Sequence, residues 1–222
     1  YKSKNVFFSD LTFQRGMNFD MAKNQIKKYI RYIKIRREIL TEYKKFKKLY
    51  FNKKDKILGV HFRGSTYKTA RGYTMPPSAS IMIKNIKYLI KKFNYSKVFI
   101  VTEEQKYIEI LKKEFKEKCI CFPSFRMQNE DSFKIYPRKN HRYLLGKEIL
   151  IETLLLSECS GLTYVKSNVA SAAIVLSKKK LKLHEMFLGY NPRNRFYSGW
   201  IWYLRSVLPS YIGGLKLVKK NS

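Results

Sequence analysis

Acidic side chains are scarce in this chain, which carries 16 Asp and Glu against 47 Lys and Arg and a formal net charge of +31. An excess of this size is compatible with three partners: nucleic acid, an anionic membrane surface or an anionic substrate. Most of the excess is lysine. It occurs in stretches rich in Lys, Ile, Asn and Tyr, a composition that an AT-rich genome encodes. The charge by itself therefore assigns none of these partners.

Long apolar runs are also missing, and none approaches the roughly 20 residues that a membrane-spanning helix needs. The N-terminus lacks the order of charged, apolar and small residues that marks a secretory signal. Because the sequence begins with Tyr1 rather than Met, we expect a piece of a longer protein. A hydrophobic content of 45% and an aromatic content of 15% are typical of a globular protein, and the three cysteines are those expected of a cytoplasmic one.

Cysteine is rare, and the spacing of Cys119, Cys121 and Cys159 fits no metal site. We expect Cys119 and Cys121 to project from opposite faces of a short strand, which would prevent them from binding one ion together. The chain also lacks the glycine-rich dinucleotide and P-loop signatures and the Gly-x-Ser-x-Gly elbow of hydrolases. These absences predict reduced thiols, no bound metal and no dinucleotide cofactor.

From residue 57 onward, short apolar runs alternate with longer amphipathic segments. We expect strands over 57–61, 97–102, 119–122, 162–165 and 181–184, separated by helices over 76–93, 103–117, 144–159 and 169–176. Ser78 is the expected N-cap of the first of these helices. The alternation predicts an α/β fold, Rossmann-like, with a parallel sheet and helices on both faces. Basic helices over 21–51 precede it, and an aromatic-rich cap over 186–222 follows it.

Polar side chains follow several of the predicted strands at the point where each strand ends. Because the carboxyl ends of parallel strands meet at one edge of the sheet, these side chains are expected to form one rim. An arginine there matches two phosphate oxygens, a glycine lets a backbone approach a ligand, and a helix start attracts an anion. The rim contains His61, Arg63, Ser65, Thr66, Glu103, Ser167 and Asn168, and Gly64 is the glycine that follows Arg63. Ordinary N-capping, a polar loop or a charge at a helix start are the alternatives.

Four segments of the chain resemble a known family. Gly59–Tyr67 is similar to the His-x-Arg segment of fucosyltransferases that use GDP-fucose, the group of nodulation protein Z and the protein O-fucosyltransferases. Val101–Glu104 resembles that family's Ala-Thr-Asp-Asp segment. Glu148–Ser157 is similar to its helix before the fourth strand, and Lys166–Ser171 to its serine-rich turn. The four segments occur in the family's order and spacing.

The resemblance implies a GT-B glycosyltransferase in which the donor lies on the second, Rossmann-like half. Residues 1–55 would be a remnant of the acceptor-side domain with connecting basic helices, and 56–185 the nucleotide-sugar-binding domain. It implies transfer of fucose or a related sugar from a GDP-sugar to a glycan acceptor of a bacterial capsule or lipo-oligosaccharide. No metal would be required. The basic helices could rest on the anionic inner membrane.

The resemblance also implies roles for individual residues. Arg63 would bind the β-phosphate of GDP and stabilise the charge that develops there as the sugar leaves. His61 would lie beside the nucleotide, Glu103 would bind ribose or guanine, and Glu152 falls at a family acidic position. Ser167 and Asn168 would bind the diphosphate.

The general base is unassigned, because Thr66, Tyr67 and Arg71 stand where relatives carry Asp, Lys and a carboxylate. Glu104 and Asp131 are the remaining candidates for that role. Two alternative functions follow from other features. The high charge and the aromatic tail would suit a basic nucleic-acid-binding module, although no nucleic-acid motif is present. A chain that lacks a general base could instead be a non-catalytic relative that still binds the nucleotide.

Overall fold

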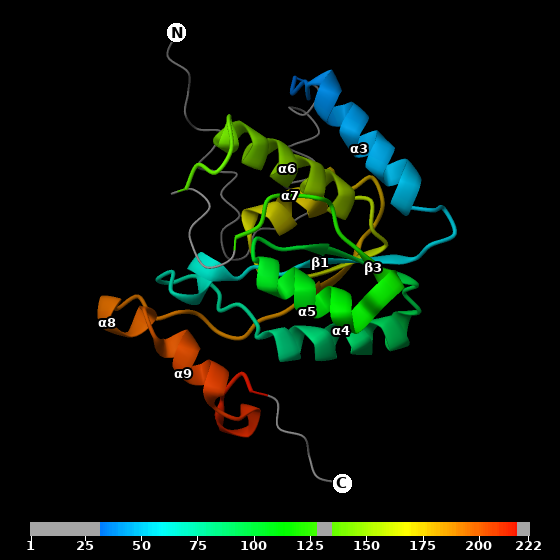
Figure 1. The fold of residues 1–222 in the computed structure, drawn as a ribbon. Coiled ribbons are helices and arrows are strands. Elements are labelled where there is room, and N and C mark those ends of the chain that lie inside the picture. The colour runs from blue at the N-terminus through cyan, green and yellow to red at the C-terminus, as the bar shows by residue number, and fades with distance from the viewer. Residues whose placement is uncertain (1–31, 128–134, 217–222) are drawn as a thin grey trace.

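The structure, a computed structural model, describes residues 32–127 and 135–216 (Figure 1). The predicted helical stretch over 21–51 therefore lies partly outside the described residues. Its described part is α3 (Arg37–Tyr50), which carries Ile39 and Phe46 into the core. Asp131, one of the two candidates for a general base, also lies outside the described residues.

Five parallel strands form a single sheet in the order β3-β2-β1-β4-β5. They are β1 (Ile57–His61), β2 (Lys97–Val101), β3 (Cys119–Ile120), β4 (Gly161–Tyr164) and β5 (Lys182–Glu185). All five residues of β1 are buried, as expected for the central strand of a sheet that is covered on both faces. The order changes direction between β1 and β4, and ligands of open α/β sheets bind at such a switch point. The predicted α/β class is confirmed.

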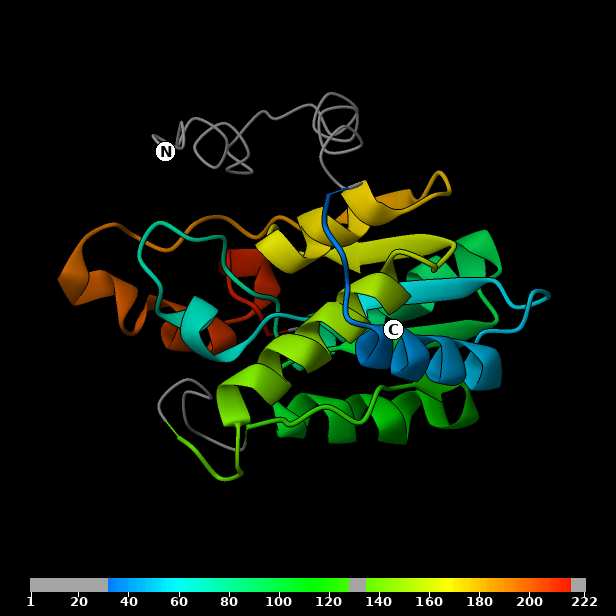
Figure 2. The same cartoon turned by 90° about the horizontal axis from the view of Figure 1, so that it is seen from above.

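Helices cover both faces of the sheet (Figures 1 and 2). One core cluster joins the sheet to α3, α6 (His141–Leu156) and α7 (Asn168–Leu176). The other joins it to α4 (Ala79–Phe93) and α5 (Gln105–Phe115). Successive strand side chains point to opposite faces, and this two-residue period divides the apolar residues of β1 and β2 between the two clusters.

Several element boundaries differ from those predicted. Strand β3 ends at Ile120 rather than Phe122, and α6 begins at His141 rather than Leu144. Helix α5 begins at Gln105, so Glu103 and Glu104 precede it and do not form its first turn. The residues at which edge strands and helices end depend on contacts with neighbouring loops. The local apolar pattern carries no information about those contacts. The predicted cap of α4 is confirmed, because the Ser78 hydroxyl accepts a hydrogen bond from the Ile81 N–H at 3.4 Å.

The expectation that Cys119 and Cys121 point to opposite faces is wrong. Their sulfur atoms lie 3.5 Å apart, because side chains two residues apart along an extended chain share a face. Both thiols are free and half-buried, whereas the thiol of Cys159 is free and fully buried. Among the residues that the structure describes, no group of three or more His, Cys, Asp and Glu side chains could hold a metal ion.

The C-terminal segment packs against the loop that precedes α4. It contains α8 (Arg195–Ser198), α9 (Ile201–Val207) and the 3-10 helix η3 (Ser210–Ile212). Trp202 of α9 is buried with Met75 and Leu215, and its indole N–H donates to the carbonyl of Pro76 at 2.8 Å. Within the described ranges, no helix combines the length and the apolar character that crossing a bilayer would need.

Candidate functional site

A pocket lies at the carboxyl edge of β1 and β2, beside α6. The two strand ends, the segment that follows β3, one face of α6 and the start of α7 all contribute side chains to it. Its lining consists of His61, Phe62, Arg63, Val101, Thr102, Glu103, Ser124, Phe125, Met127, Leu145, Glu148, Ile149, Glu152 and Val169. The pocket is at the edge where the sequence predicts a binding site, and it brings together His61, Arg63, Glu103 and Glu152.

The register of β1 and β2 places the polar side chains in the pocket. His61 pairs with Val101 across the two parallel strands, so the residues two positions further on, Arg63 and Glu103, lie side by side. Phe62 points to the other face, where its ring stacks on Tyr107 with centroids 4.1 Å apart and an interplanar angle of 11°. This buried stack anchors the backbone on which His61 and Arg63 are carried.

Arg63 and Glu103 form an ion pair across the end of the sheet. Arg63 Nη1 lies 2.9 Å from Glu103 Oε2, with 26% and 20% of the two side chains exposed. The Arg63 guanidinium carbon lies 4.6 Å from the ring centroid of Tyr67, a distance typical of a cation–π contact. The Nε atom of Arg63 is buried and has no hydrogen-bond partner. An oriented guanidinium that lines a pocket is a suitable contact for an anionic oxygen.

His61 is buried and contacts Ser167, with Nδ1 and the hydroxyl oxygen 3.2 Å apart. Burial lowers the pKa of His61, the neighbouring charge of Arg63 acts in the same direction, and together they bring it from 6.5 to about 3. The imidazole is therefore neutral near neutral pH. Ser167 also caps α7, because its hydroxyl accepts a hydrogen bond from the Ala170 N–H at 3.2 Å.

Three other predicted site residues, Asn168, Ser65 and Gly64, lie at separate places in the structure. Asn168 is the exposed first residue of α7, and Val169 is the residue of that helix that lines the pocket. Ser65 begins the 3-10 helix η1 (Ser65–Lys68). A Cβ atom added at Gly64 would lie 2.2 Å from Glu104 Oε1, so its missing side chain leaves room for Glu104 and not for a ligand. Glu104 itself pairs with Lys68 at 2.7 Å and does not line the pocket.

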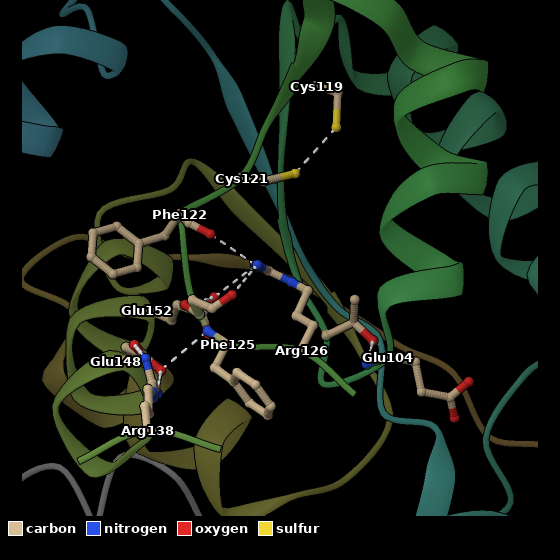
Figure 3. A network of polar contacts seen from close by, with 11 residues as sticks. Glu104, Cys119, Cys121, Phe122, Phe125, Arg126, Arg138, Glu148 and Glu152 are labelled. Carbon is tan, nitrogen blue, oxygen red and sulfur yellow. Dashed lines mark hydrogen bonds and ion pairs between the residues drawn. The ribbon is translucent and has the colours of Figure 1, made fainter. Parts of the chain in front are cut away.

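One wall of the pocket is fixed by two arginine–glutamate pairs that sequence reasoning missed (Figure 3). Arg138 binds Glu148 with both terminal nitrogens, at 2.6 and 2.7 Å. Arg126 Nη2 lies 3.1 Å from Glu152 Oε1, with only 6% and 7% of the two side chains exposed. The spacing of Glu148 and Glu152, four residues apart on one helix, indicates that they share a face, but no local pattern identifies the two arginines that pair with them.

Glu152 has the environment of a functional carboxyl group. It accepts a hydrogen bond from the Ser124 hydroxyl at 2.7 Å in addition to its contact with Arg126. Burial raises the pKa of Glu152 from 4.5 to about 7, although Arg126 and Ser124 act in the opposite direction. A carboxyl group that is close to half protonated at neutral pH can either donate or accept a proton in the pocket.

Comparison with known proteins returns solved structures but no curated relative. No family model matches the chain, and no curated protein matches it. The NodZ alpha-1,6-fucosyltransferase co-crystallized with GDP is 17% identical, with a TM-score of 0.46 over 67% of this chain and 44% of that one. The fucosyltransferase NodZ from Bradyrhizobium is 18% identical, with a TM-score of 0.45 over 67% and 44%.

A second group of similar structures contains POFUT1. POFUT1 in complex with GDP-fucose is 11% identical, with a TM-score of 0.44 over 70% of this chain and 47% of that one. The chain thus spans about half the length of the solved structures that it matches. The comparison returns the same group of enzymes that the sequence segments resemble.

Proposed function

We propose that this chain is the donor-binding half of a glycosyltransferase that transfers fucose, or a related sugar, from a GDP-sugar to a glycan. The observation that carries the proposal is Arg63, whose guanidinium is oriented by Glu103 and Tyr67 in a pocket at the carboxyl edge of the sheet. Its neighbour Glu103 supplies hydrogen-bond acceptors in the same pocket. Open α/β folds bind their ligands at this edge, and a guanidinium there matches two phosphate oxygens.

In the proposed mechanism, Arg63 acts on the leaving group. As the bond between the sugar carbon and the β-phosphate oxygen breaks, negative charge accumulates on that phosphate, and the guanidinium stabilises it. The incoming phosphate would compete with Glu103 for Arg63, which would release the carboxylate to accept hydrogen bonds from ribose hydroxyls or the guanine edge. The neutral His61 would add hydrogen bonding without charge, oriented by Ser167.

The start of α7 would hold the other phosphate group. Ser167 and Asn168 begin a nine-residue helix whose first N–H groups and positive dipole end favour an anion. No metal is required in this arrangement, since the diphosphate charge is met by Arg63 and the helix start. We assign no general base, because Glu104 is paired with Lys68 away from the pocket lining and Glu152 is already held by Arg126 and Ser124.

Calorimetric titration with GDP and GDP-fucose tests the proposal directly. The wild-type protein should bind both nucleotides, and binding should persist in the presence of EDTA. Arg63→Ala should weaken GDP binding about ten- to hundredfold, the value of one charge-assisted phosphate contact of about 1.5–3 kcal/mol. Arg37→Ala is the matched control, because Arg37 is an exposed arginine of α3 and should leave the affinity unchanged. A folded wild-type sample that binds no GDP would refute the proposal.

A non-catalytic nucleotide-binding protein is the second candidate, favoured by the lack of an assigned base. Product analysis with GDP-fucose and candidate glycan acceptors separates it from an active transferase, since it would bind the donor without transfer or hydrolysis. For the active enzyme we propose an acceptor from a bacterial capsule or lipo-oligosaccharide. We also propose a cytoplasmic location in which exposed lysines of α3, such as Lys44 and Lys48, contact the anionic inner membrane.

A further inference from the structure

Two thiols lie side by side at the edge of the sheet and are used by nothing in the proposed mechanism. Cys119 and Cys121 are half-buried on the α5 side of β3, with their sulfur atoms 3.5 Å apart. The third cysteine, Cys159, is fully buried on the opposite face of the sheet. The chain thus contains one close pair of accessible thiols and one thiol that is closed to solvent.

One of the two cysteines lies outside the hydrogen-bonded ladder of the sheet. The ladder between β2 and β3 consists of the pairs Val98–Cys119 and Phe99–Ile120 and ends there. Cys121 therefore lies just beyond the last paired residue of an edge strand. Bringing the two sulfur atoms to a bonding distance of about 2 Å needs a shift of roughly 1.5 Å, which an unpaired residue can supply.

The two thiols also differ in their readiness to react. The hydrogen bond from Cys119 lowers the pKa of Cys121, and the positive charges of Arg126 and Lys112 lower it further, against the opposing effect of burial. The pKa of Cys119 is raised, first by that same hydrogen bond and then by burial. Because the thiolate is the nucleophile and Cys121 lies beyond the last ladder pair, we assign the attack to Cys121 and its resolution to Cys119.

The pair is connected to the wall of the pocket (Figure 3). Cys121 is followed by Phe122, whose carbonyl accepts a hydrogen bond from Arg126 Nη2 at 2.9 Å. The same nitrogen binds Glu152 at 3.1 Å. A displacement at Cys121 therefore moves the carbonyl that helps to orient Arg126, and through it the segment that carries the pocket residues Ser124 and Phe125.

We propose that Cys119 and Cys121 form a thiol–disulfide modification site whose oxidation is transmitted to the pocket wall. The co-reactant is a low-molecular-weight disulfide. The Cys121 thiolate attacks one of its sulfur atoms and releases one thiolate, leaving a mixed disulfide on Cys121. The released thiolate takes the proton of Cys119, whose sulfur then attacks the Cys121 sulfur and releases a second small thiolate, which takes up from solvent the proton that Cys121 had lost. Two protein thiols are oxidised to one disulfide while the small disulfide is reduced to two thiols.

Oxidised glutathione is the probe for the first part of the test. After incubation of the folded wild-type protein, tryptic cleavage at Lys118 and Arg126 yields peptide 119–126, which contains both cysteines. We expect this peptide to lose the mass of two hydrogen atoms and to resist alkylation, while Cys159 remains alkylatable after unfolding. Two free thiols in peptide 119–126, or a stable glutathione adduct without closure, would overturn the proposal.

Serine variants test the assigned order of attack. Cys119→Ser should stop at a glutathione adduct on Cys121, because the resolving thiol is missing. Cys121→Ser should form far less adduct on Cys119. The reverse pattern would contradict the assignment, and the wild-type measurement still decides disulfide formation if either variant fails to fold.

Hydrogen exchange tests transmission to the pocket wall without any nucleotide. The amide of Phe125 donates to Glu148 at 3.2 Å and should be protected in the reduced protein. Oxidation should speed exchange over residues 122–127, and reduction with dithiothreitol should restore it. Unchanged exchange in a sample whose disulfide has formed would refute the transmission.

Discussion

Glu152 is a buried carboxyl group whose titration makes the stability of the protein depend on pH. Its pKa is raised from 4.5 to about 7, so between these two values the folded state binds a proton that the unfolded state has released. Stability should therefore fall as the pH rises from about 4.5 to about 7, by roughly 3 kcal/mol in total for this group. Urea unfolding at a series of pH values measures the slope.

Glu152→Gln removes this titration and keeps an oxygen that can accept from Ser124 and Arg126. The variant should show a flatter dependence of the unfolding free energy on pH over the same range. If wild type and variant had the same slope, another group would be responsible. Replacement of Arg63, in contrast, should weaken nucleotide binding without preventing folding, because a quarter of the Arg63 side chain is exposed.

Two arginines that precede helix α6 in the chain, Arg126 and Arg138, form ion pairs with glutamates of that helix. Arg138 makes two short hydrogen bonds to Glu148, a carboxylate whose side chain is only 9% exposed. Arg138→Ala would leave that charge poorly compensated and should lower the free energy of unfolding by about 1–3 kcal/mol. Arg138→Lys should lose part of that amount, because an ammonium group cannot bind both oxygens in the same fork.

Urea unfolding also measures this effect, and Arg142→Ala serves as the control on an exposed arginine of the same helix. Equal free energies of unfolding for wild type and Arg138→Ala would show that the Arg138–Glu148 pair does not stabilise the fold. Because Phe125 donates to Glu148 as well, the expected loss includes a looser pocket wall and not only a lost ion pair.

The charge of the whole molecule bears on the proposed membrane contact. A net charge of +31 should favour phosphatidylglycerol vesicles over neutral phosphatidylcholine vesicles, and added salt should weaken the binding. If α3 is the contact surface, Lys44→Glu with Lys48→Glu should reduce vesicle binding roughly tenfold or more, at about 1 kcal/mol for each lysine.

The matched control reverses two exposed lysines on the opposite face of the sheet, Lys84 and Lys91 of α4. Co-sedimentation with vesicles measures both variants. An equal loss in the two double variants would mean that the total charge, rather than the α3 face, determines binding. No preference for anionic vesicles in the wild-type protein would contradict the proposed contact altogether.

The sequence by itself determined the succession of strands and helices, the cap at Ser78 and the edge at which the polar residues gather. These features depend on short-range rules: apolar periodicity, the capping of a free N–H by a hydroxyl, and the shared direction of parallel strands. The same two-residue period separates Glu103 in the pocket from Glu104 outside it. Applied to Cys119 and Cys121, that period would have placed both thiols on one face.

Only the tertiary structure decided which partners these side chains meet. Arg126 and Arg138 precede α6 in stretches without a periodic pattern, and their pairing with Glu148 and Glu152 depends on how the residues around each arginine pack on α6. The pairing of Arg63 with Glu103 needs the register of two strands that are forty residues apart in the chain. The pKa of Glu152 likewise results from burial among segments distant in sequence, because desolvation depends on the packed environment and not on neighbouring residues in the chain.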